Sequence, residues 1–150
     1  MILNKPLFII VTIASLLGAC KANTGADTEI AITDNWVREN APGQSVGAAY
    51  MTLNSPKDST LIKVETPAAG TVEIHSLSMD KGVMKMRMLE ELPLKAGKPE
   101  KLAPGGLHLM LFDLKTPLKS GKNVVFKLSF KNNAGKITQQ NVILPIKVAD

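Results

Sequence analysis

The sequence predicts an all-β fold, and three features of its composition support this prediction. Its 150 residues suit a single domain with a hydrophobic core. The chain has only one Trp, one Tyr and four Phe, so Val, Ile, Leu and Met should fill most of that core. Eleven Gly and nine Pro separate short apolar runs, which is typical of many short strands rather than of long helices.

The first nineteen residues are expected to be an export signal. Lys5 provides a positive charge, residues 7–17 are apolar, and Leu-Gly-Ala precedes Cys20. The apolar run is too short to span a bilayer. The tetrapeptide ending at Cys20 resembles the lipobox of bacterial lipoproteins, which predicts that Cys20 is lipidated. An ordinary secretory signal is the alternative, and either one exports the protein. Lys21, by resemblance to bacterial sorting rules, favours an outer membrane.

Residues 20–28 are expected to form the lipidated cysteine and a flexible tether, and residues 29–150 the folded domain. Within that domain, apolar alternation and turn residues predict a series of strands. Proline and glycine interrupt residues 92–104, which should form short edge pairing or a loop. The predicted strands cover residues 30–38, 46–53, 61–64, 71–77, 83–89, 107–114, 124–130 and 137–148.

A soft, neutral ligand set lies between residues 75 and 110, which include both histidines and five of the seven methionines. His75 is followed by Met86, and His108 by Met110. Thioethers select reduced copper and imidazole tolerates several metals, so these residues predict a Cu(I) site. Lipidation would consume Cys20, the only cysteine, which argues against zinc, iron–sulfur and blue-copper centres with thiolate ligands.

Strand alternation places His75 on the face opposite Ile74, and places His108 and Met110 side by side on the face opposite Leu109. Met86 is harder to assign. If its face is buried, it lies on the core side, unlike the two histidines; if that face is exposed, two charged neighbours point inward. A bulge, an edge position or a site at one end of the sandwich would remove the conflict.

The other methionines have simpler interpretations. Met51, Met84 and Met88 are expected to be core residues, because methionine fills gaps well. Met79 is placed in a turn over residues 79–82, beside the first histidine, and is a possible auxiliary ligand.

Other functional classes have little support. The formal net charge is +5, yet no basic–aromatic stripe accompanies the lysines, which argues against nucleic-acid binding. No nucleophile–base arrangement and no phosphate-binding loop is present in the sequence, so the protein is not expected to be an enzyme. Trp36 is interpreted as a packing residue and Arg38 as an exposed strand residue, and the sequence places neither near the metal.

Three stretches resemble the bacterial periplasmic copper chaperones called PCu(A)C. They are EIHSLSMDKGVMKMRM, LAPGGLHLMLFDLKTPLKSGKNVVFKLSF and, upstream, NWVRENAPGQSVGAAYMTLNS. The family pattern is His, ten residues, Met, twenty-one residues, then His-x-Met, and the chain matches it at all four positions. The resemblance covers nearly all of residues 29–148. Some members carry Met where this chain has Ser76. Residues 144–150 contain neither His nor Met, so a second copper site in the tail is not expected.

The resemblance implies a cupredoxin-like Greek-key β-sandwich or barrel that binds one Cu(I) through His75, Met86, His108 and Met110. It implies a chaperone that delivers copper to the CuA centre of respiratory oxidase. The protein is expected to be a monomer. The expected partners are the copper-bearing subunit of cytochrome c oxidase, a Sco-type thioredoxin-like chaperone, or both. The expected location is the periplasm, with a lipid anchor in the membrane. A periplasmic copper buffer or resistance lipoprotein without a dedicated recipient is the alternative, and a structural lipoprotein with accidental ligand spacing is a third.

Overall fold

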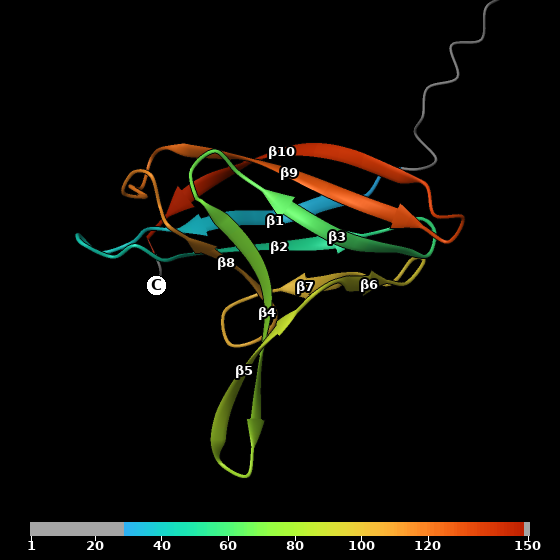
Figure 1. The fold of residues 1–150 in the computed structure, drawn as a ribbon, viewed down its shortest axis with the longest axis horizontal. Helices are drawn as coiled ribbons and strands as arrows, with labels where there is room; N and C mark the ends of the chain where they lie inside the picture. The colour runs from blue at the N-terminus through green and yellow to red at the C-terminus, as the bar shows by residue number, and fades with distance from the viewer. Residues whose placement is uncertain (1–28, 149–150) are drawn as a thin grey trace, which may run out of the picture.

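The computed structural model describes residues 29–148, which form ten β-strands (Figure 1). The expected all-β fold is therefore confirmed, and most strands lie within a few residues of their predicted bounds. The strands are β1 (Ala31–Arg38), β2 (Gly47–Asn54), β3 (Ser59–Glu65), β4 (Thr71–Asp80), β5 (Val83–Leu89), β6 (Leu92–Leu94), β7 (Glu100–Leu102), β8 (His108–Phe112), β9 (Asn123–Asn132) and β10 (Ile137–Lys147).

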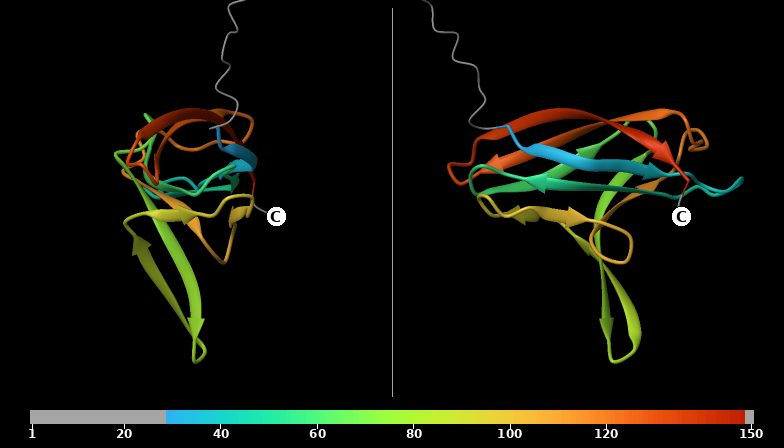
Figure 2. Two further views of the ribbon diagram at one scale, coloured as in Figure 1. Left: turned by 90° about the vertical axis from the view of Figure 1, so that its right-hand side faces the viewer. Right: turned by 180° about the vertical axis from the view of Figure 1, so that it is seen from behind.

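The strands form two layers, seen edge-on in Figure 2. One layer has the order β5-β4-β8-β2-β1, with β7 also paired to β2, and the other has the order β10-β9-β3-β6. A short parallel pairing of β1 with β10 joins them, with Val37 opposite Ile146. All other strand pairs in this part of the chain are antiparallel. The chain therefore folds as a β-sandwich.

The hydrophobic core lies between the two layers and follows the alternation of the strands. On β9, Phe126 and Leu128 are completely buried, and on β8 Leu109 and Leu111 are completely buried. Fully burying each such side chain stabilises the fold by about 1.5–3 kcal/mol. Because Leu109 and Leu111 point into the core, the intervening residues of β8 point to the outer face.

Residues 92–104 form short edge pairing, as predicted. Strand β6 pairs with β3, and β7 pairs with β2, over three residues each. Pro93 lies within β6 at the edge of its sheet, where its missing N–H removes no interior ladder bond. No helix in the part of the chain that the structure describes is long and apolar enough to cross a membrane.

Strands β4 and β5 form a hairpin that extends well beyond the body of the sandwich (Figure 1). Its turn consists of Lys81 and Gly82, which both have positive φ, as a two-residue turn of type I′ requires. The prediction of a turn over residues 79–82 was too long. Met79 belongs to β4 and pairs with Met84, because the strand ladder continues up to the two-residue turn.

The described chain begins on the side of the sandwich away from the hairpin. Ile30 lies beside β10, where its N–H donates a hydrogen bond to the side-chain oxygen of Gln140 across 3.3 Å and its carbonyl accepts one from the side-chain amide across 2.9 Å. All three ribbon views place this entry point and the tip of the hairpin at opposite ends of the molecule (Figures 1 and 2).

Candidate metal centre

The two histidines are direct cross-strand neighbours at the base of the hairpin. His75 on β4 is in register with His108 on β8, and their ring centroids are 5.8 Å apart. Residues directly opposite each other in an antiparallel pair lie on the same face of the sheet. That face is the outer one, as predicted, because the neighbouring Ile74 and Leu109 are buried in the core. The structure therefore brings together two imidazoles that are far apart in the sequence.

Hydrogen bonds fix one nitrogen of each imidazole. Nε2 of His75 donates to a carboxylate oxygen of Glu73 across 2.7 Å, and Nδ1 of His108 donates to the carbonyl oxygen of Gly106 across 3.0 Å. Each bond assigns the proton to the bonded nitrogen, which leaves a lone pair on Nδ1 of His75 and on Nε2 of His108. This arrangement matches the way proteins prepare histidine for a metal.

Nδ1 of His75 is buried and has no hydrogen-bond partner among the described residues. A buried polar atom without a partner costs free energy unless a bound group satisfies it. The His75 side chain is only 12% exposed, and His108 as a whole only 8%. The ring of Phe112, whose centroid is 6.1 Å from that of His75, adds an apolar neighbour to this partly dry site. A soft metal ion bound to Nδ1 would satisfy the atom.

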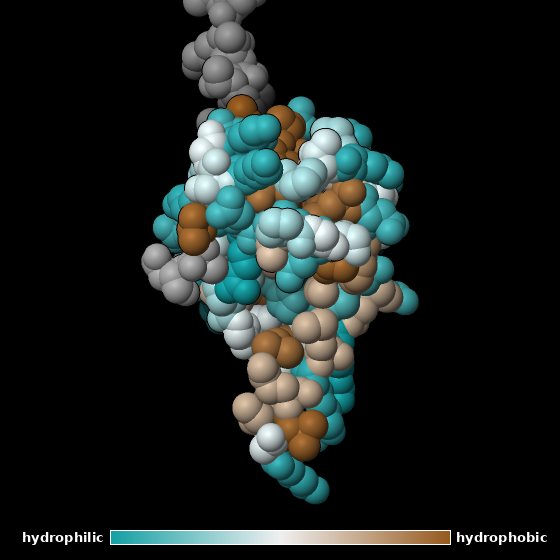
Figure 3. Space-filling view, turned by 90° about the vertical axis from the view of Figure 1, so that its left-hand side faces the viewer, coloured by the Kyte–Doolittle hydropathy of each residue, from teal (hydrophilic) through white to brown (hydrophobic). Residues whose placement is uncertain are grey.

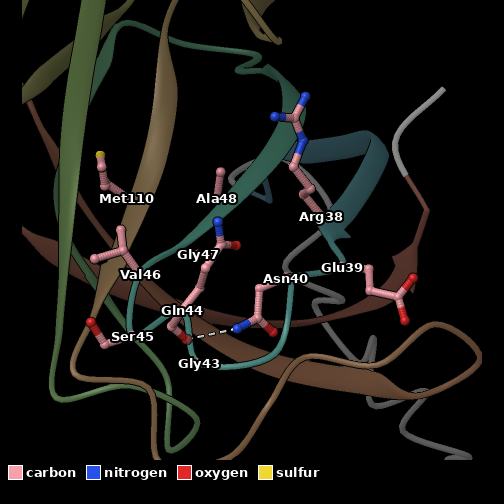
Figure 4. A pocket seen from close by; sticks show the side chains of 10 residues that line it. All are labelled: Arg38, Glu39, Asn40, Gly43, Gln44, Ser45, Val46, Gly47, Ala48 and Met110. Carbon is pink, nitrogen blue, oxygen red and sulfur yellow. Dashed lines mark hydrogen bonds between the residues drawn. The ribbon is translucent and has the colours of Figure 1, made fainter.

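Met110 lies on the same face, two residues beyond His108. It is in register with Glu73 on one side and with Ala48 on the other. It also lines a pocket of about 480 Å³ formed with Arg38 and the segment from Glu39 to Gly47 (Figure 4). Ala48 lies between Met110 and Arg38 in that view. The thioether of Met110 is therefore reachable from this pocket.

The position of Met86 in the fold removes the conflict between its face of the strand and that of its charged neighbours. Strand β5 is the outermost strand of its layer and belongs to the projecting hairpin, so neither of its faces is covered by the second layer. Met86 can therefore share a face with the two histidines while its charged neighbours occupy the opposite, equally exposed face. The edge position was one of the predicted solutions.

The register of the hairpin places Met88, rather than Met86, directly opposite His75. Met86 instead pairs with Leu77, one step closer to the tip. Met88 is 57% exposed and Met86 50%, so the prediction that Met88 is a core residue was wrong, as was the same prediction for Met84. Met51, in contrast, is completely buried in the core, as predicted.

Distances along the sheet separate the four predicted ligands into a compact group and a more distant member. His75, His108 and Met110 lie on adjacent strands, within two residue positions of each other along the strand direction. Met86 lies about 14 Å from Met110 along the strands and about 10 Å across them at regular sheet spacings, whereas Met88 is offset along the strands by only about 7 Å. Met86 would reach the group only if the hairpin twists or folds over the face.

Met79 lies two steps beyond His75 toward the tip of the hairpin, in register with Met84. It shares the face of the histidines but not their immediate surroundings. Cys20 and the predicted signal and tether lie outside the described residues.

Two residues near the site were not identified from the sequence. The hydrogen bond from His75 to Glu73 was not foreseen, although Glu73 lies two residues earlier in the same strand and therefore on the same face, which is a usable signal. Arg38 lines the pocket beside Met110, and its guanidinium lies 5.9 Å from the centre of the Tyr50 ring. Trp36 packs against the same ring, with 4.6 Å between centroids, in agreement with its predicted packing role.

The donor set depends on methionine. No group of three or more His, Cys, Asp or Glu side chains within residues 29–148 is arranged to hold a metal ion. The carboxylate of Glu73 is already bonded to His75. Two imidazoles with thioethers beside them form a soft set, which suits reduced copper far better than calcium, magnesium or manganese.

Comparisons with solved structures support the fold. The copper-bound PCuAC domain from PmoF2 aligns with a TM-score of 0.65 and 21% identity, over 83% of this chain and 97% of that domain. Apo-DR1885 from Deinococcus radiodurans aligns with a TM-score of 0.61 and 28% identity, over 99% of this chain and 97% of that one. CuI-DR1885 from the same organism aligns with a TM-score of 0.57 and 28% identity, over 85% and 83%. The chain therefore has the cupredoxin-like fold of PCuAC domains.

Two curated relatives match in sequence. One is the "Putative lipoprotein Lxx21020" of Leifsonia xyli subsp. xyli, 28% identical over 79% of this chain and 69% of the relative. The other is the uncharacterised protein RP573 of Rickettsia prowazekii, 29% identical over 78% of this chain and 68% of the relative. Residues 30–143 match the model of the family described as "Putative lipoprotein LpqE-like". With a match over most of its length and the PCuAC fold, the chain belongs to the LpqE-like family of PCuAC-type domains.

Proposed function

We propose that this protein is an exported copper chaperone that binds one Cu(I) ion at the base of its β4–β5 hairpin. The observation that carries the proposal is the pair of facing imidazoles, His75 and His108. In each ring one nitrogen donates a hydrogen bond, and the other nitrogen keeps a lone pair that can bind a metal. The similarity to CuI-DR1885, a structure whose name states its metal, supports the choice of reduced copper.

The proposed ligands are Nδ1 of His75, Nε2 of His108 and the thioethers of Met110 and Met86. The first three lie on adjacent strands, within two residue positions of each other along the strand direction. Met86 completes the set that the sequence pattern predicts, and it reaches the others if the hairpin folds toward β8. Met88 is the alternative fourth ligand, because it is the direct register partner of His75.

Such a site suits transfer rather than catalysis. Imidazole and thioether ligands are neutral, so the bound ion keeps its positive charge and remains attractive to a partner with thiolate ligands. The hairpin leaves the proposed ligand Met86 exposed, which allows a partner to replace the ligands one at a time, starting from that thioether. The proposed recipients are the copper-bearing subunit of cytochrome c oxidase, for its CuA centre, and a Sco-type thioredoxin-like chaperone.

The proposed location is the periplasm, with a lipid on Cys20 as the membrane anchor. Membership of a family described as lipoproteins supports the anchor. The main alternative function, a periplasmic copper buffer, uses the same site but has no dedicated recipient.

Copper affinity tests the ligand set. Cu(I) is titrated against a chromophoric chelator for the wild type and for His75→Ala, His108→Ala, Met110→Ala and Met86→Ala. We expect one tightly held ion per chain. Removing a residue that only hydrogen-bonds to a metal ligand lowers metal affinity by roughly 10- to 100-fold, and removing a ligand itself should lower the Cu(I) affinity by more than that. The matched control is Met51→Leu, a core substitution of similar volume away from the site, which should leave affinity unchanged. Wild-type affinity in all four ligand variants would refute the proposal.

A transfer experiment separates the chaperone from the buffer. The Cu(I)-loaded protein is mixed with an apo oxidase copper domain or with an apo Sco-type protein, and the copper in each is measured after separation. The chaperone should lose its ion faster to these proteins than to a small thiol of equal affinity. Equal rates would favour the buffer.

A further inference from the structure

The outer half of the hairpin carries two methionines, Met79 and Met84, that the proposed copper site does not use. Met79 and Met84 are direct cross-strand partners beside the turn, 67% and 60% exposed. Met86 lies one step further from the turn, on the same strand and the same face as Met84. We call these three residues the tip methionines.

The two faces of the hairpin differ sharply in chemistry. The three residue pairs that share the face of His75 are Met79–Met84, Leu77–Met86 and His75–Met88, so four of the six side chains are methionine. The opposite face of the outer hairpin carries polar and charged side chains, including an ion pair between Lys85 and Asp80, together with one exposed apolar residue, Val83, beside the turn. Figure 3 shows this division as tan and brown atoms along one side of the projection and teal atoms along the other.

Exposed apolar side chains in a soluble protein call for an explanation when they are contiguous. A surface that only excludes water could use leucine, isoleucine or phenylalanine, which have better-defined rotamers. The repeated choice of methionine adds a property that those residues lack, a thioether sulfur that binds soft metal ions. The stripe formed by the four methionines on this face also continues directly to His75, a proposed copper ligand.

The spacing of the tip methionines permits a common ligand position. Direct cross-strand partners have Cβ atoms about 4.5–5.5 Å apart, and diagonal neighbours about 7–8 Å apart. A methionine side chain has three rotatable bonds, so three sulfurs at these separations can converge on one ion without any backbone movement. Nothing in the described part of the chain covers this face of the hairpin.

We infer that Met79, Met84 and Met86 form a second Cu(I) site at the tip of the hairpin, with three thioether ligands and weaker binding than the histidine site. Met86 lies between this site and the histidines, so it can serve either one. An ion captured at the exposed tip can then move toward His75 by exchange of neighbouring ligands. This inference extends the proposed function, but binding at the tip does not require the histidine site.

Methyl NMR of methionine resolves the two sites. The exported protein, solubilised in detergent with its own N-terminal processing, carries ¹³C in its methionine methyl groups and is titrated with Cu(I) under reducing conditions. Methionine methyl signals shift when their sulfur binds the ion. Met51 is completely buried in the core, so its signal reports whether each variant is folded.

Three proteins are compared: the wild type, the tip variant Met79→Leu/Met84→Leu, and the base variant His75→Gln/Met110→Leu. Leucine keeps the tip apolar and of similar size, so only the sulfur is removed. We expect the wild type to bind two ions, with the signals of Met79 and Met84 shifting at the weaker step. The base variant should keep the tip shifts and bind one ion, and the tip variant should lose only the weaker step.

Unshifted signals of Met79 and Met84 in both the wild type and the base variant, at several-fold excess of Cu(I), would overturn the inference and leave the stripe as a protein-docking surface. If Met110 still shifts in that case, the proposed histidine site stands. If Met110 does not shift while the tip signals do, the tip site stands and the proposed function fails.

Discussion

The carboxylate of Glu73 accepts a hydrogen bond from Nε2 of His75 across 2.7 Å. While this bond holds Nε2, the Nδ1 atom of His75 is buried and has no hydrogen-bond partner among residues 29–148. A carboxylate bonded to a histidine ligand fixes its tautomer and raises its basicity. Glu73 therefore supports the metal site without being one of its proposed ligands.

The first prediction concerns Glu73. Replacing Glu73 by Ala should lower the affinity for Cu(I) by about 10- to 100-fold, because His75 loses the partner that orients it. Competition titration measures the change, and Glu73→Gln should have a smaller effect because its amide oxygen can still accept the bond. The control is Glu100→Ala on β7, away from the hairpin. Equal affinities for Glu73→Ala and the control would show that the bond has no role.

The second prediction compares the two candidate thioethers of β5. Met86→Leu should weaken binding by more than about tenfold, which is a loss of about 1.4 kcal/mol, while Met88→Leu should change it by less than threefold. The sequence pattern favours Met86, whereas the register places Met88 beside His75. The opposite order of effects in a competition titration would assign the fourth ligand to Met88, and would show that the hairpin keeps its extended position when copper binds.

The third prediction concerns pH. Binding requires both imidazoles in their neutral form, so protons compete with copper, whereas thioethers do not bind protons in this range. The affinity for Cu(I) should therefore fall as the pH is lowered from about 7.5 to about 5. Titrations at several pH values test this. The variant His75→Met, which retains one imidazole, should show a shallower dependence, and a flat profile for the wild type would contradict ligation by histidine.

The fourth prediction concerns the acid stability of the sandwich. Asp58 accepts hydrogen bonds from the backbone N–H of Ala96, at 2.8 Å, and from Lys95, at 3.1 Å. The Ala96 bond, followed by the Lys95 contacts, holds the pKa of Asp58 below its ordinary value of 3.8. A lowered pKa means that the folded state binds this proton less readily than the unfolded state. The stabilisation is thus present above the ordinary pKa and is lost as the pH falls through the lowered one.

Unfolding by denaturant over a range of about pH 2 to 6 measures this effect. The difference in unfolding free energy between the wild type and Asp58→Asn should be constant at the upper end and should shrink below the ordinary pKa of Asp58. A difference that is independent of pH down to the acid limit would mean that Asp58 contributes nothing through its charge.

Much of the scaffold can be read from local sequence. In β4 and β8 the alternation of apolar and polar side chains correctly places Ile74 and Leu109 in the core and His75 and His108 on the outer face. Alternation is a local property, because successive residues of a strand point to opposite sides. Prolines and glycines likewise locate the broken segment that forms β6 and β7.

The register between strands was beyond local reasoning. The pairing of His75 with His108, and of His75 with Met88, depends on how segments far apart in the sequence align across the sheet. The prediction that Met84 and Met88 are core residues was wrong for a related reason. It assumed that a strand has one buried face, whereas β5 extends past the edge of the opposite layer and has none.

The start of the described chain and the tip of the hairpin lie at opposite ends of the molecule, so its two ends have different roles (Figures 1 and 2). The described chain starts beside Gln140 on β10, and the tip methionines lie at the far end of the hairpin. If Cys20 is anchored as proposed, the membrane would lie on the side where the described chain begins. The copper-binding end would then face away from the membrane, into the aqueous compartment. Cargo would then be offered to proteins approaching from solution, or to the protruding domain of a neighbouring membrane complex, before they meet any other part of the molecule.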